Sequence, residues 1–415
     1  MPDLTSPSQT KIQQNQEPQL SWPKRIVFGL ISIVFAFAVV ACAGELLLRV
    51  LPMGRYRSTP FRQYDPVLGI SLIPNMRVVH SRGCFTGLVE TNSWGFRDRA
   101  RTLAKPPGTF RIALLGDSIV EAVHVQPEQV MNIQMEKILQ QQGYNNIEVM
   151  DFAVEGIGTT QEYIMYKERV RQFHPDLVIV IFSDNDILNN SSTLQPKEYG
   201  IHTWYAPYYD LGPDGNLVFR PVESRSFNSI RTYLERHSVL VYYLERIWLK
   251  YDPTVYKWHG VDVGYGTYST DPLDPEWAQA WTVTEKLLEM MRQSVEADGA
   301  KFLVIAQANP YVVVPDWHQY MMKREGKIPD GFDPPKYYER LQDITTKANV
   351  KLESLVPFMV AYRDAHHLEF PYFSLPCDTH YSALGHHAVA EGLVDILEKD
   401  RYIPPVGAHG TPALP

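Results

Sequence analysis

The sequence predicts an α/β fold built on a central parallel sheet and preceded by one transmembrane helix. Two patterns support this prediction. From residue 111 onward, short apolar runs alternate with segments of helical period, as in repeated strand–helix–strand units. Near the amino terminus, one uncharged apolar run is long enough to cross a bilayer. The 415 residues suffice for one large domain or two ordinary ones.

The amino-terminal part is predicted to be a polar tail followed by a membrane-spanning helix over residues 26–50. Residues 1–25 are rich in Gln, Pro and Ser, which is typical of disorder. The uncharged run 26–44 would rise about 28 Å as a helix, close to the roughly 30 Å core of a bilayer. Lys11, Lys24 and Arg25 favour a cytoplasmic tail, with the rest of the chain outside the cytoplasm, whereas the arginines that follow the helix weaken this signal: Arg49, Arg55, Arg57 and Arg62. Cleavage of this segment as a signal peptide is the alternative.

Charge and cysteine content restrict the partners and the compartment. The net charge of −8 comes without a basic stripe, so we expect no nucleic-acid partner. Cys42 lies in the apolar run, and the other two cysteines are Cys84 and Cys377. We expect these two as free, partly buried thiols, with a disulfide in an oxidising compartment as the alternative.

Each predicted element follows from the local pattern. Residues 51–105 show little period and are predicted to be an extended lead-in, followed by a domain over 106–403 and a flexible tail over 404–415. Apolar runs predict strands at 112–115, 147–152, 177–182, 301–307 and 350–355. Helical period predicts helices at 127–142, 160–173, 277–296, 337–348 and 382–397. The rhythm breaks at about 191–271, which we interpret as an insertion. The strand–helix order predicts parallel pairing with right-handed crossovers.

Polar residues follow several predicted strands or precede the last predicted helix. Because the carboxyl ends of parallel strands meet at one edge of a sheet, these loops are expected to adjoin in space. In chain order, they hold Ser118, Gly156, Asn185, and the pair Asp378 and His380.

These residue types are the ones that acyl transfer by a serine requires. A hydroxyl becomes an effective nucleophile when a base takes its proton, and a histidine held by a carboxylate is the usual base. We predict Ser118 as the nucleophile, His380 as the base and Asp378 as the acid that orients the imidazole. The backbone N–H groups of Ser118 and Gly156, together with the Asn185 amide, are the predicted oxyanion hole. This chemistry calls for no metal and no cofactor.

The loops resemble the sequence blocks of the SGNH (GDSL-type) hydrolase superfamily, which is named for its Ser, Gly, Asn and His. The residues that match these positions in order are Ser118, Gly156, Asn185 and His380, with Asp378 ahead of the histidine. Two further segments, NSWGFR at 92–97 and GIGTTQ at 156–161, resemble a membrane-anchored bacterial subgroup. The resemblance implies a three-layer α/β/α flavodoxin-like sandwich and activity on esters.

The chain departs from the family pattern at three positions. The usual Asp-x-x-His is Asp378-x-His380, which changes how the carboxylate approaches the ring. Ser183 stands where a glycine usually precedes the third-block Asn, and Tyr381 stands where a proline often follows the histidine. The first departure bears on the orienting acid, and the other two bear on loop shape.

Other polar residues near these blocks are predicted to have structural roles. We expect Asp117 and Asp186 to brace their loops by accepting backbone N–H groups. The remaining histidines of these blocks are interpreted as surface or packing residues: His124, His386 and His387.

The preferred function is a membrane-anchored serine esterase that hydrolyses an acyl ester, such as an acetyl ester, of a glycan, cell-envelope or lipid substrate. An O-acyltransferase of cell-envelope polysaccharide would use the same acyl-enzyme. A non-catalytic glycan-binding or assembly protein would keep the fold. Metal-dependent phosphoester hydrolysis would need the ligands Asp117, Asp184, Asp186, Asp378 and His380, and no local ligand spacing supports it. The sequence leaves the acyl group, the acceptor and the oligomeric state open.

Overall fold

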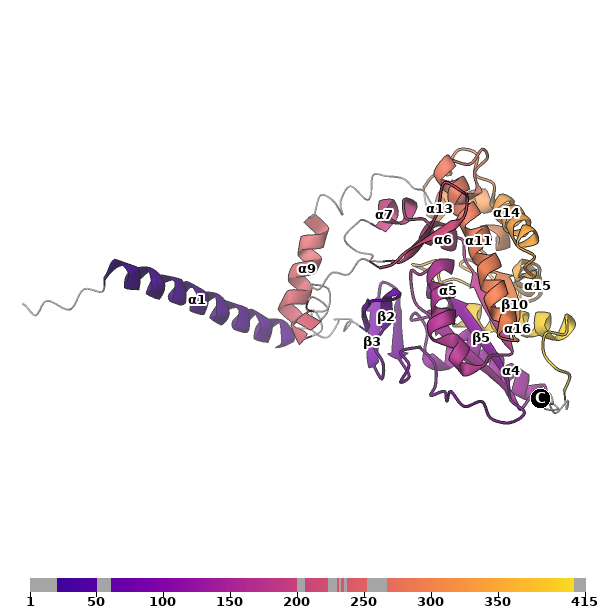
Figure 1. The fold of residues 1–415 in the computed structure, drawn as a ribbon, viewed down its shortest axis with the longest axis horizontal. Helices are drawn as coiled ribbons and strands as arrows, with labels where there is room; N and C mark the ends of the chain where they lie inside the picture. The colour runs from indigo at the N-terminus through magenta and orange to yellow at the C-terminus, as the bar shows by residue number, and fades with distance from the viewer. Residues whose placement is uncertain are drawn as a thin grey trace, which may run out of the picture.

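The centre of the fold is a five-stranded, fully parallel sheet (Figure 1). The computed structural model describes residues 21–50, 61–199, 206–222, 230, 233–234, 237–251, 267–324 and 326–406. The strands of the sheet are β5 (Phe110–Gly116), β6 (Ile147–Ala153), β7 (Leu177–Phe182), β10 (Lys301–Ala306) and β11 (Leu352–Ser354). They lie in the order β11-β10-β7-β5-β6. Of these five strands, β5 comes first in the sequence, and it lies between β6 and β7, which come second and third. This is the flavodoxin-like order, and it confirms the predicted fold class.

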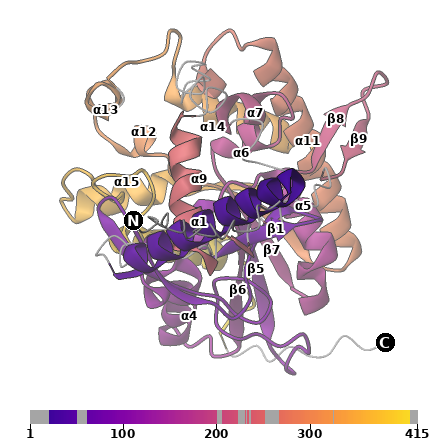
Figure 2. The same cartoon turned by 90° about the vertical axis from the view of Figure 1, so that its left-hand side faces the viewer.

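Helices cover both faces of the sheet and make three layers. One face carries α5 (Thr159–Glu168), α11 (Pro275–Ala297) and α14 (Pro334–Lys347). The other face carries α3 (Ser118–Glu121), α4 (Met131–Gln141), α15 (Val356–Ala365) and α16 (Ala383–Lys399). Figure 2 shows α4 and α15 on one side of the sheet and α5 and α11 on the other. The 3-10 helices η1 (Pro127–Gln129) and η2 (Val170–Phe173) adjoin α4 and α5.

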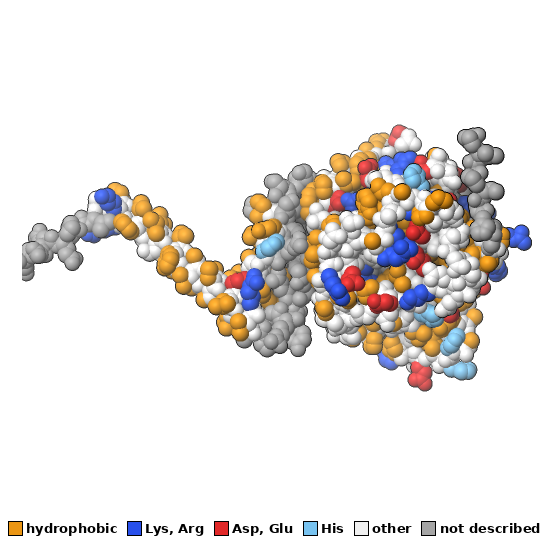
Figure 3. Space-filling model, turned by 90° about the horizontal axis from the view of Figure 1, so that it is seen from below, with side chains coloured by type: hydrophobic (Ala, Val, Ile, Leu, Met, Phe, Trp, Pro, Cys, Tyr) orange, Lys and Arg blue, Asp and Glu red, His pale blue; other side chains and the backbone are white. Residues whose placement is uncertain are grey.

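The amino-terminal helix α1 (Trp22–Val50) projects away from the three layers (Figure 1). It is long and apolar enough to cross a membrane, and its hydrophobic side chains are exposed along its length (Figure 3). The helix begins at Trp22, so the prediction that residues 22–25 belong to a disordered tail is wrong. Pro23 sits in the first turn, where a missing N–H leaves no bond unmade. Residues 1–20 of the predicted tail lie outside the described residues.

The lead-in and the insertion contain antiparallel hairpins that the sequence pattern does not reveal. In the lead-in, β1 (Arg62–Asp65) pairs with β2 (Gly69–Leu72), and β3 (Arg77–Arg82) pairs with β4 (Phe85–Glu90). In the insertion, β8 (Tyr208–Leu211) pairs with β9 (Leu217–Arg220). The strands β1, β2, β8 and β9 have four residues each, too few for a clear period of two.

Short helices complete the domain. Those after β7 and β10 are α6 (Asn185–Asn189), α12 (Pro310–Val313) and α13 (Trp317–Arg324). Those of the insertion are α7 (Leu194–Tyr199), α9 (Val239–Tyr251) and η4 (Thr267–Ser269). Much of the insertion, and residues 407–415 of the predicted flexible tail, lie outside the described residues.

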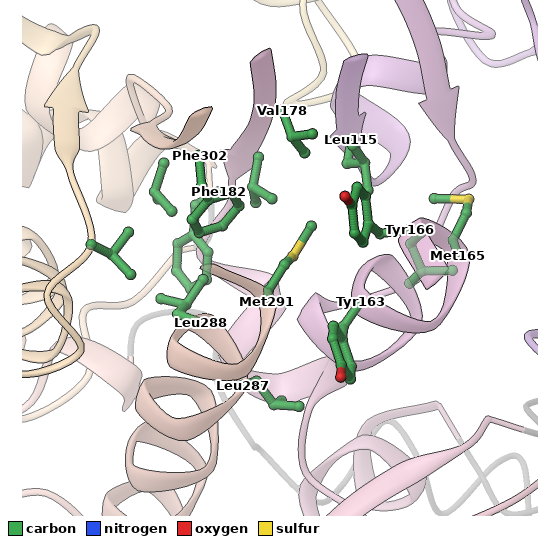
Figure 4. Packing of buried hydrophobic residues seen from close by; sticks show 14 of the residues in the cluster. Leu115, Tyr163, Met165, Tyr166, Val178, Phe182, Leu287, Leu288, Met291 and Phe302 are labelled. Carbon is green, nitrogen blue, oxygen red and sulfur yellow. The ribbon is translucent and has the colours of Figure 1, made fainter. Parts of the chain in front are cut away.

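Alternate residues of the buried strands enter two separate cores. The residues of β7 are all buried and divide between the cores, with Val178, Val180 and Phe182 in one and Leu177, Ile179 and Ile181 in the other. Figure 4 shows the first core, where strand residues such as Leu115 and Val178 pack near Tyr166 of α5 and Met291 of α11. A strand that is covered on both faces has a continuous apolar run, so the sequence predicts 177–182 with the observed bounds.

Cys84 and Cys377 form a disulfide, with their Cα atoms 5.8 Å apart. The expectation of two free thiols is therefore wrong. The residues are 293 positions apart in sequence. They meet because the turn of the β3–β4 hairpin lies against the loop that precedes α16. Among the described residues, Cys42 on α1 is the free cysteine.

Candidate active site

Ser118 directly follows the turn at the carboxyl end of β5. Asp117 caps the short helix α3, and its Oδ1 accepts the backbone N–H of Ile119 at 2.9 Å. Gly116 permits the tight turn, because a Cβ at this position would lie 2.4 Å from the side chain of Val120. The strand order reverses beside β5, and open α/β sheets hold their ligands at such a point.

The loop before α16 brings His380 and Asp378 to Ser118. The Nε2 atom of His380 lies 2.7 Å from Oγ of Ser118. The Nδ1 atom of His380 lies 2.5 Å from Oδ1 of Asp378, and the same oxygen accepts the backbone N–H of His380 at 3.1 Å. The short Asp-x-His spacing therefore still brings the carboxylate to the ring, because the carboxylate closes a tight turn over its own backbone. The three side chains form one hydrogen-bonded chain with the geometry of a catalytic triad.

The His380 loop is held at several points. The N–H of Leu375 donates to the carbonyl of His380 at 2.9 Å, and Ser374 makes an antiparallel bridge with Tyr381. Cys377, next to Asp378, is tied by the disulfide to the β3–β4 hairpin. The loop thus has covalent and backbone supports on both sides of the carboxylate.

Burial and charge act in opposite directions on the two ionisable groups. Burial lowers the pKa of His380, but the hydrogen bond and charge of Asp378 outweigh it, so this pKa lies above its ordinary value. Burial raises the pKa of Asp378, but the hydrogen bonds and charge of His380 hold it well below the usual carboxyl range. Asp378 is therefore ionised near neutral pH, and it stabilises the protonated form of His380.

Gly156 and Asn185 lie on the wall of the same cavity as the triad. Gly156 follows β6 and has φ of +78°, a backbone conformation that glycine adopts readily. Among the described residues, its backbone N–H and that of Ser118 have no acceptor. The Nδ2 atom of Asn185 donates to Oδ2 of Asp117 at 2.7 Å, which fixes the amide and leaves its second hydrogen. The structure therefore gathers all five predicted site residues at one cavity of about 300 Å³.

The aspartates around the site brace its loops. Besides the Ile119 N–H, Asp117 accepts the Ser183 hydroxyl at 3.3 Å. Asp186 accepts the Ser183 backbone N–H at 2.7 Å, as predicted for a bracing residue. Asp184 accepts the hydroxyl of Tyr268 and the amide of Asn309. Burial raises the pKa of each of these three carboxyls.

His124 contacts the site in a way that the sequence does not reveal. Its ring stacks on the ring of His380, with centroids 3.9 Å apart. The ring is buried, and among the described residues its Nδ1 atom has no hydrogen-bond partner. Burial lowers the pKa of His124 to about 3, so this imidazole is neutral near pH 7. The prediction of a packing histidine agrees with this position, but the sequence gives no sign that the packing partner is His380.

One group of ligand-type side chains in the described residues lies close enough to hold a cation. The ligand atoms of His124, Asp378 and His380 all lie within 4.8 Å of one another. Asp378 and His380 are already hydrogen-bonded to each other, and His380 also contacts Ser118. This group differs from the ligand set considered for phosphoester hydrolysis. It contains His124 and lacks Asp117, Asp184 and Asp186.

Sequence reasoning missed two walls of the cavity. Gln307, Asn309 and Tyr311 line it and directly follow β10. The position of these residues after a predicted strand is a usable signal.

On another wall, Glu155 pairs with Arg62 of the lead-in at 2.5 Å, and Arg62 also pairs with buried Glu121 at 2.6 Å. No sequence signal joins Arg62 to this site, because the contact depends on where the β1–β2 hairpin packs.

No protein-family model and no curated protein sequence matches this chain. Among solved structures, it is similar to TesA, with 14% identity, 70% of this chain and 98% of that chain covered, and a TM-score of 0.36. A lipase/acylhydrolase from Enterococcus faecalis shares 13% identity over 70% of this chain and 97% of that one, with a TM-score of 0.36. The acetyl xylan esterase AlAXEase shares 15% identity over 69% of this chain and 100% of that one, with a TM-score of 0.39. The roles of the site residues therefore rest on the geometry of this chain.

Proposed function

We propose that this protein is a membrane-anchored serine esterase of the SGNH (GDSL-type) hydrolase superfamily. The observation that carries the proposal is the 2.7 Å contact between Oγ of Ser118 and Nε2 of His380, with Asp378 on the other ring nitrogen. A serine in this arrangement can lose its proton to the imidazole as it attacks a carbonyl.

The proposed reaction passes through an acyl-enzyme. Oγ of Ser118 bonds to the ester carbonyl carbon, its proton passes to Nε2 of His380, and the carbonyl oxygen takes up the displaced electron pair. Collapse of this tetrahedral species breaks the bond to the alcohol, which leaves with the proton from His380. Water then attacks the acyl group by the same steps, and the carboxylic acid and free Ser118 result.

Three donors would stabilise the developing oxyanion. They are the backbone N–H groups of Ser118 and Gly156 and the second amide hydrogen of Asn185. Because Asp117 already holds the Asn185 amide, little reorganisation is needed when the oxyanion forms. Asp378 would fix the tautomer of His380 and stabilise the imidazolium.

The cavity supports a short acyl group on a hydroxyl-rich alcohol. Its volume of about 300 Å³ is at the small end of ligand sites. The cavity is also lined by the polar side chains of Gln307 and Asn309, and Glu155 and Asp184 add carboxyl groups. Such donors and acceptors suit the hydroxyl groups of a sugar, so an acetylated glycan is the proposed substrate class.

Two features support an extracytoplasmic location. The Cys84–Cys377 disulfide is typical of oxidising compartments. The helix α1 has the length and apolar surface of a single membrane span. Together they support a catalytic domain held outside the cytoplasmic membrane.

The direct test is turnover of a short-chain aryl ester by the full-length protein and its Ser118→Ala variant. We expect the variant to lose about 10⁴-fold or more in kcat while its unfolding transition is unchanged. Ser294→Ala, near the carboxyl-terminal end of α11, is the control and should turn over normally. Activity of Ser118→Ala near that of the parent would exclude Ser118 as the nucleophile.

A second measurement separates the open alternatives. A fluorophosphonate should modify Ser118 in the parent protein, and failure to label folded protein would favour a non-catalytic glycan-binding role. Mass spectrometry of cell-envelope glycans, with the parent or with Ser118→Ala, then separates water from a sugar hydroxyl as the acyl acceptor. Esterase activity predicts more acetyl groups in the variant, and O-acyltransfer predicts fewer.

A further inference from the structure

The insertion helix α9 (Val239–Tyr251) lies against the carboxyl-terminal end of α1 (Figure 1). Leu240 of α9 packs beside Gly44 of α1, where a Cβ on the glycine would lie 3.7 Å from the leucine methyl groups. These two helices are almost 200 residues apart in sequence. Their contact joins the insertion to the end of the apolar helix.

A charged residue of α1 caps α9. The carboxylate of Glu45 accepts the backbone N–H groups of Val239 at 3.0 Å and Leu240 at 2.8 Å, and the Ser238 hydroxyl at 2.9 Å. Arg49, one turn further along α1, donates to the carbonyl of His237 at 2.9 Å. Glu45 thus satisfies N–H groups that the first turn of a helix leaves free, and its charge favours the positive end of the helix dipole.

The position of this cap sets the depth of α9 relative to a bilayer. Glu45 is the first charged residue after the uncharged run 26–44, so it marks the boundary of the apolar part of α1. If α1 spans the membrane, the first turn of α9 lies at the membrane–water boundary. Figures 1 and 2 both show α9 running steeply across the direction of α1, which places α9 along the membrane surface.

The side chains of α9 that point outward include large apolar ones. Leu244 is 55% exposed and Ile247 is 54% exposed, and their spacing of three residues puts them on one face of the helix. Ile230, Tyr233 and Leu234, which precede α9, are also exposed, and the last two follow Ile230 by three and four residues. An apolar face of this kind in water is unfavourable by about 25 cal/mol per Å², and a bilayer surface removes that cost.

We propose that α9 is an interfacial helix that inserts Leu244 and Ile247 at the boundary between lipid headgroups and acyl chains. The proposal rests on the membrane-anchor part of the proposed function and adds a second, lateral contact with the bilayer. With α9 capped by Glu45 and seated on the lipid, the chain contacts the bilayer at two places, α1 and the insertion.

The test uses the full-length protein in vesicles of phosphatidylcholine and phosphatidylglycerol. A Cys42→Ser background leaves the disulfide as the remaining cysteine pair, so single cysteines can carry an environment-sensitive fluorophore. The labelled positions are Leu244→Cys and Ile247→Cys on α9, Val34→Cys in α1, and Met322→Cys on α13 as the control. Met322 is 53% exposed on a helix of the catalytic domain, which matches the exposure of the α9 residues.

We expect lipids that carry a quencher high on the acyl chain to lower fluorescence at 244 and 247 by about twofold or more, with no loss at 322. A deep acyl-chain quencher should act at position 34. Quenching at 34 without quenching at 244 and 247 overturns the interfacial helix and keeps the anchor. If these labels are instead shielded from both lipid quencher and aqueous iodide, the face is covered by protein, which also overturns the proposal. No quenching at 34 overturns the anchor and the inference together, and aryl-ester turnover then tests the esterase separately.

Discussion

One carboxylate oxygen of Asp378 holds both the backbone N–H and the imidazole of His380. This double role explains how a spacing one residue shorter than usual still produces a triad. The backbone bond sets the position of the carboxylate, and the ring bond sets the orientation of the imidazole. At the scale of single residues, the chemistry of the site therefore depends on a tight turn as much as on residue type.

Replacing Asp378 with Asn should lower kcat by about 10³–10⁴-fold, because the imidazole loses its orienting charge. The pH dependence should also change. Asp378 raises the pKa of His380, and only neutral His380 can accept the serine proton, so the acidic limb of kcat/KM should move to lower pH in the variant. The measurement is kcat/KM for an aryl acetate from about pH 4 to 9. Asp364→Asn, an exposed change on α15, is the control, and an unshifted limb in Asp378→Asn would contradict the assignment.

His124 should act as a positioning residue for His380. Its buried ring stacks on the base at 3.9 Å, so removal of the ring leaves space for His380 to tilt. We expect His124→Ala to lower kcat by about 10- to 100-fold, because small displacements of a base are costly. His124→Phe keeps a flat ring without a titratable group and should retain most activity, with an unchanged pH profile. Equal loss in both variants would argue for a role of the imidazole nitrogens instead.

The sequence supports the prediction of site residues whose role follows from type and position at a strand end. Ser118, Gly156 and Asn185 follow buried strands, so their proximity could be expected from a parallel sheet. Two other contacts could not be expected from the sequence: the stacking of His124 on His380 and the ion pair of Arg62 with Glu155. Each joins segments whose packing has no local sequence signal.

At the scale of elements, the β3–β4 hairpin supports the loop that carries His380. The hairpin turn carries Cys84, and the disulfide joins it to Cys377, the neighbour of Asp378. The backbone N–H of Cys377 also lies 3.1 Å from the sulfur of Cys84. The lead-in, whose sequence shows little period, thus supports the site. The disulfide between Cys84 and Cys377 depends on the β3–β4 hairpin, which the sequence pattern does not predict.

Removing this crosslink should affect stability and catalysis together. We expect the double variant Cys84→Ser/Cys377→Ser to lose about 2–4 kcal/mol in the free energy of unfolding, since the bond closes a very long loop. Its kcat should also fall, because Asp378 and His380 lose one of their supports. Urea unfolding and aryl-ester kinetics measure the two effects, with Cys42→Ser as the control. A stability loss with an unaltered kcat would show that the backbone bonds of the loop suffice to hold the base.

At the scale of the whole molecule, the strand–helix rhythm predicts the sheet because each buried strand must be apolar on both faces. The same rhythm contains no information on how the insertion meets α1. That contact depends on Glu45, which in sequence is only a charge at the end of an apolar run. The layers of the α/β domain were therefore predictable, and the placement of α9 beside the proposed membrane anchor was not.

A buried glutamate in the core should make the folding stability of the domain depend on pH. Glu162 on α5 is fully buried, and among the described residues its carboxyl oxygens have no hydrogen-bond partner. Burial, with the nearby charge of Asp117, raises the pKa of Glu162 well above its ordinary value. The folded protein therefore retains a proton that the unfolded chain releases above about pH 4.3. Folding stability falls as pH rises from that value towards the raised pKa.

Glu162→Gln should remove the loss of folding stability that Glu162 causes as pH rises. At about pH 4, where the glutamate is protonated in both states, we expect the variant and the parent to unfold at similar urea concentrations. At about pH 8 the variant should be more stable by about 1–3 kcal/mol, because no buried group has to be kept protonated or charged. Glu168→Gln, at the exposed end of the same helix, should change stability at neither pH. If Glu162→Gln instead destabilises the protein equally at both pH values, Glu162 acts through packing or a further hydrogen bond, and its titration does not govern the stability of the domain.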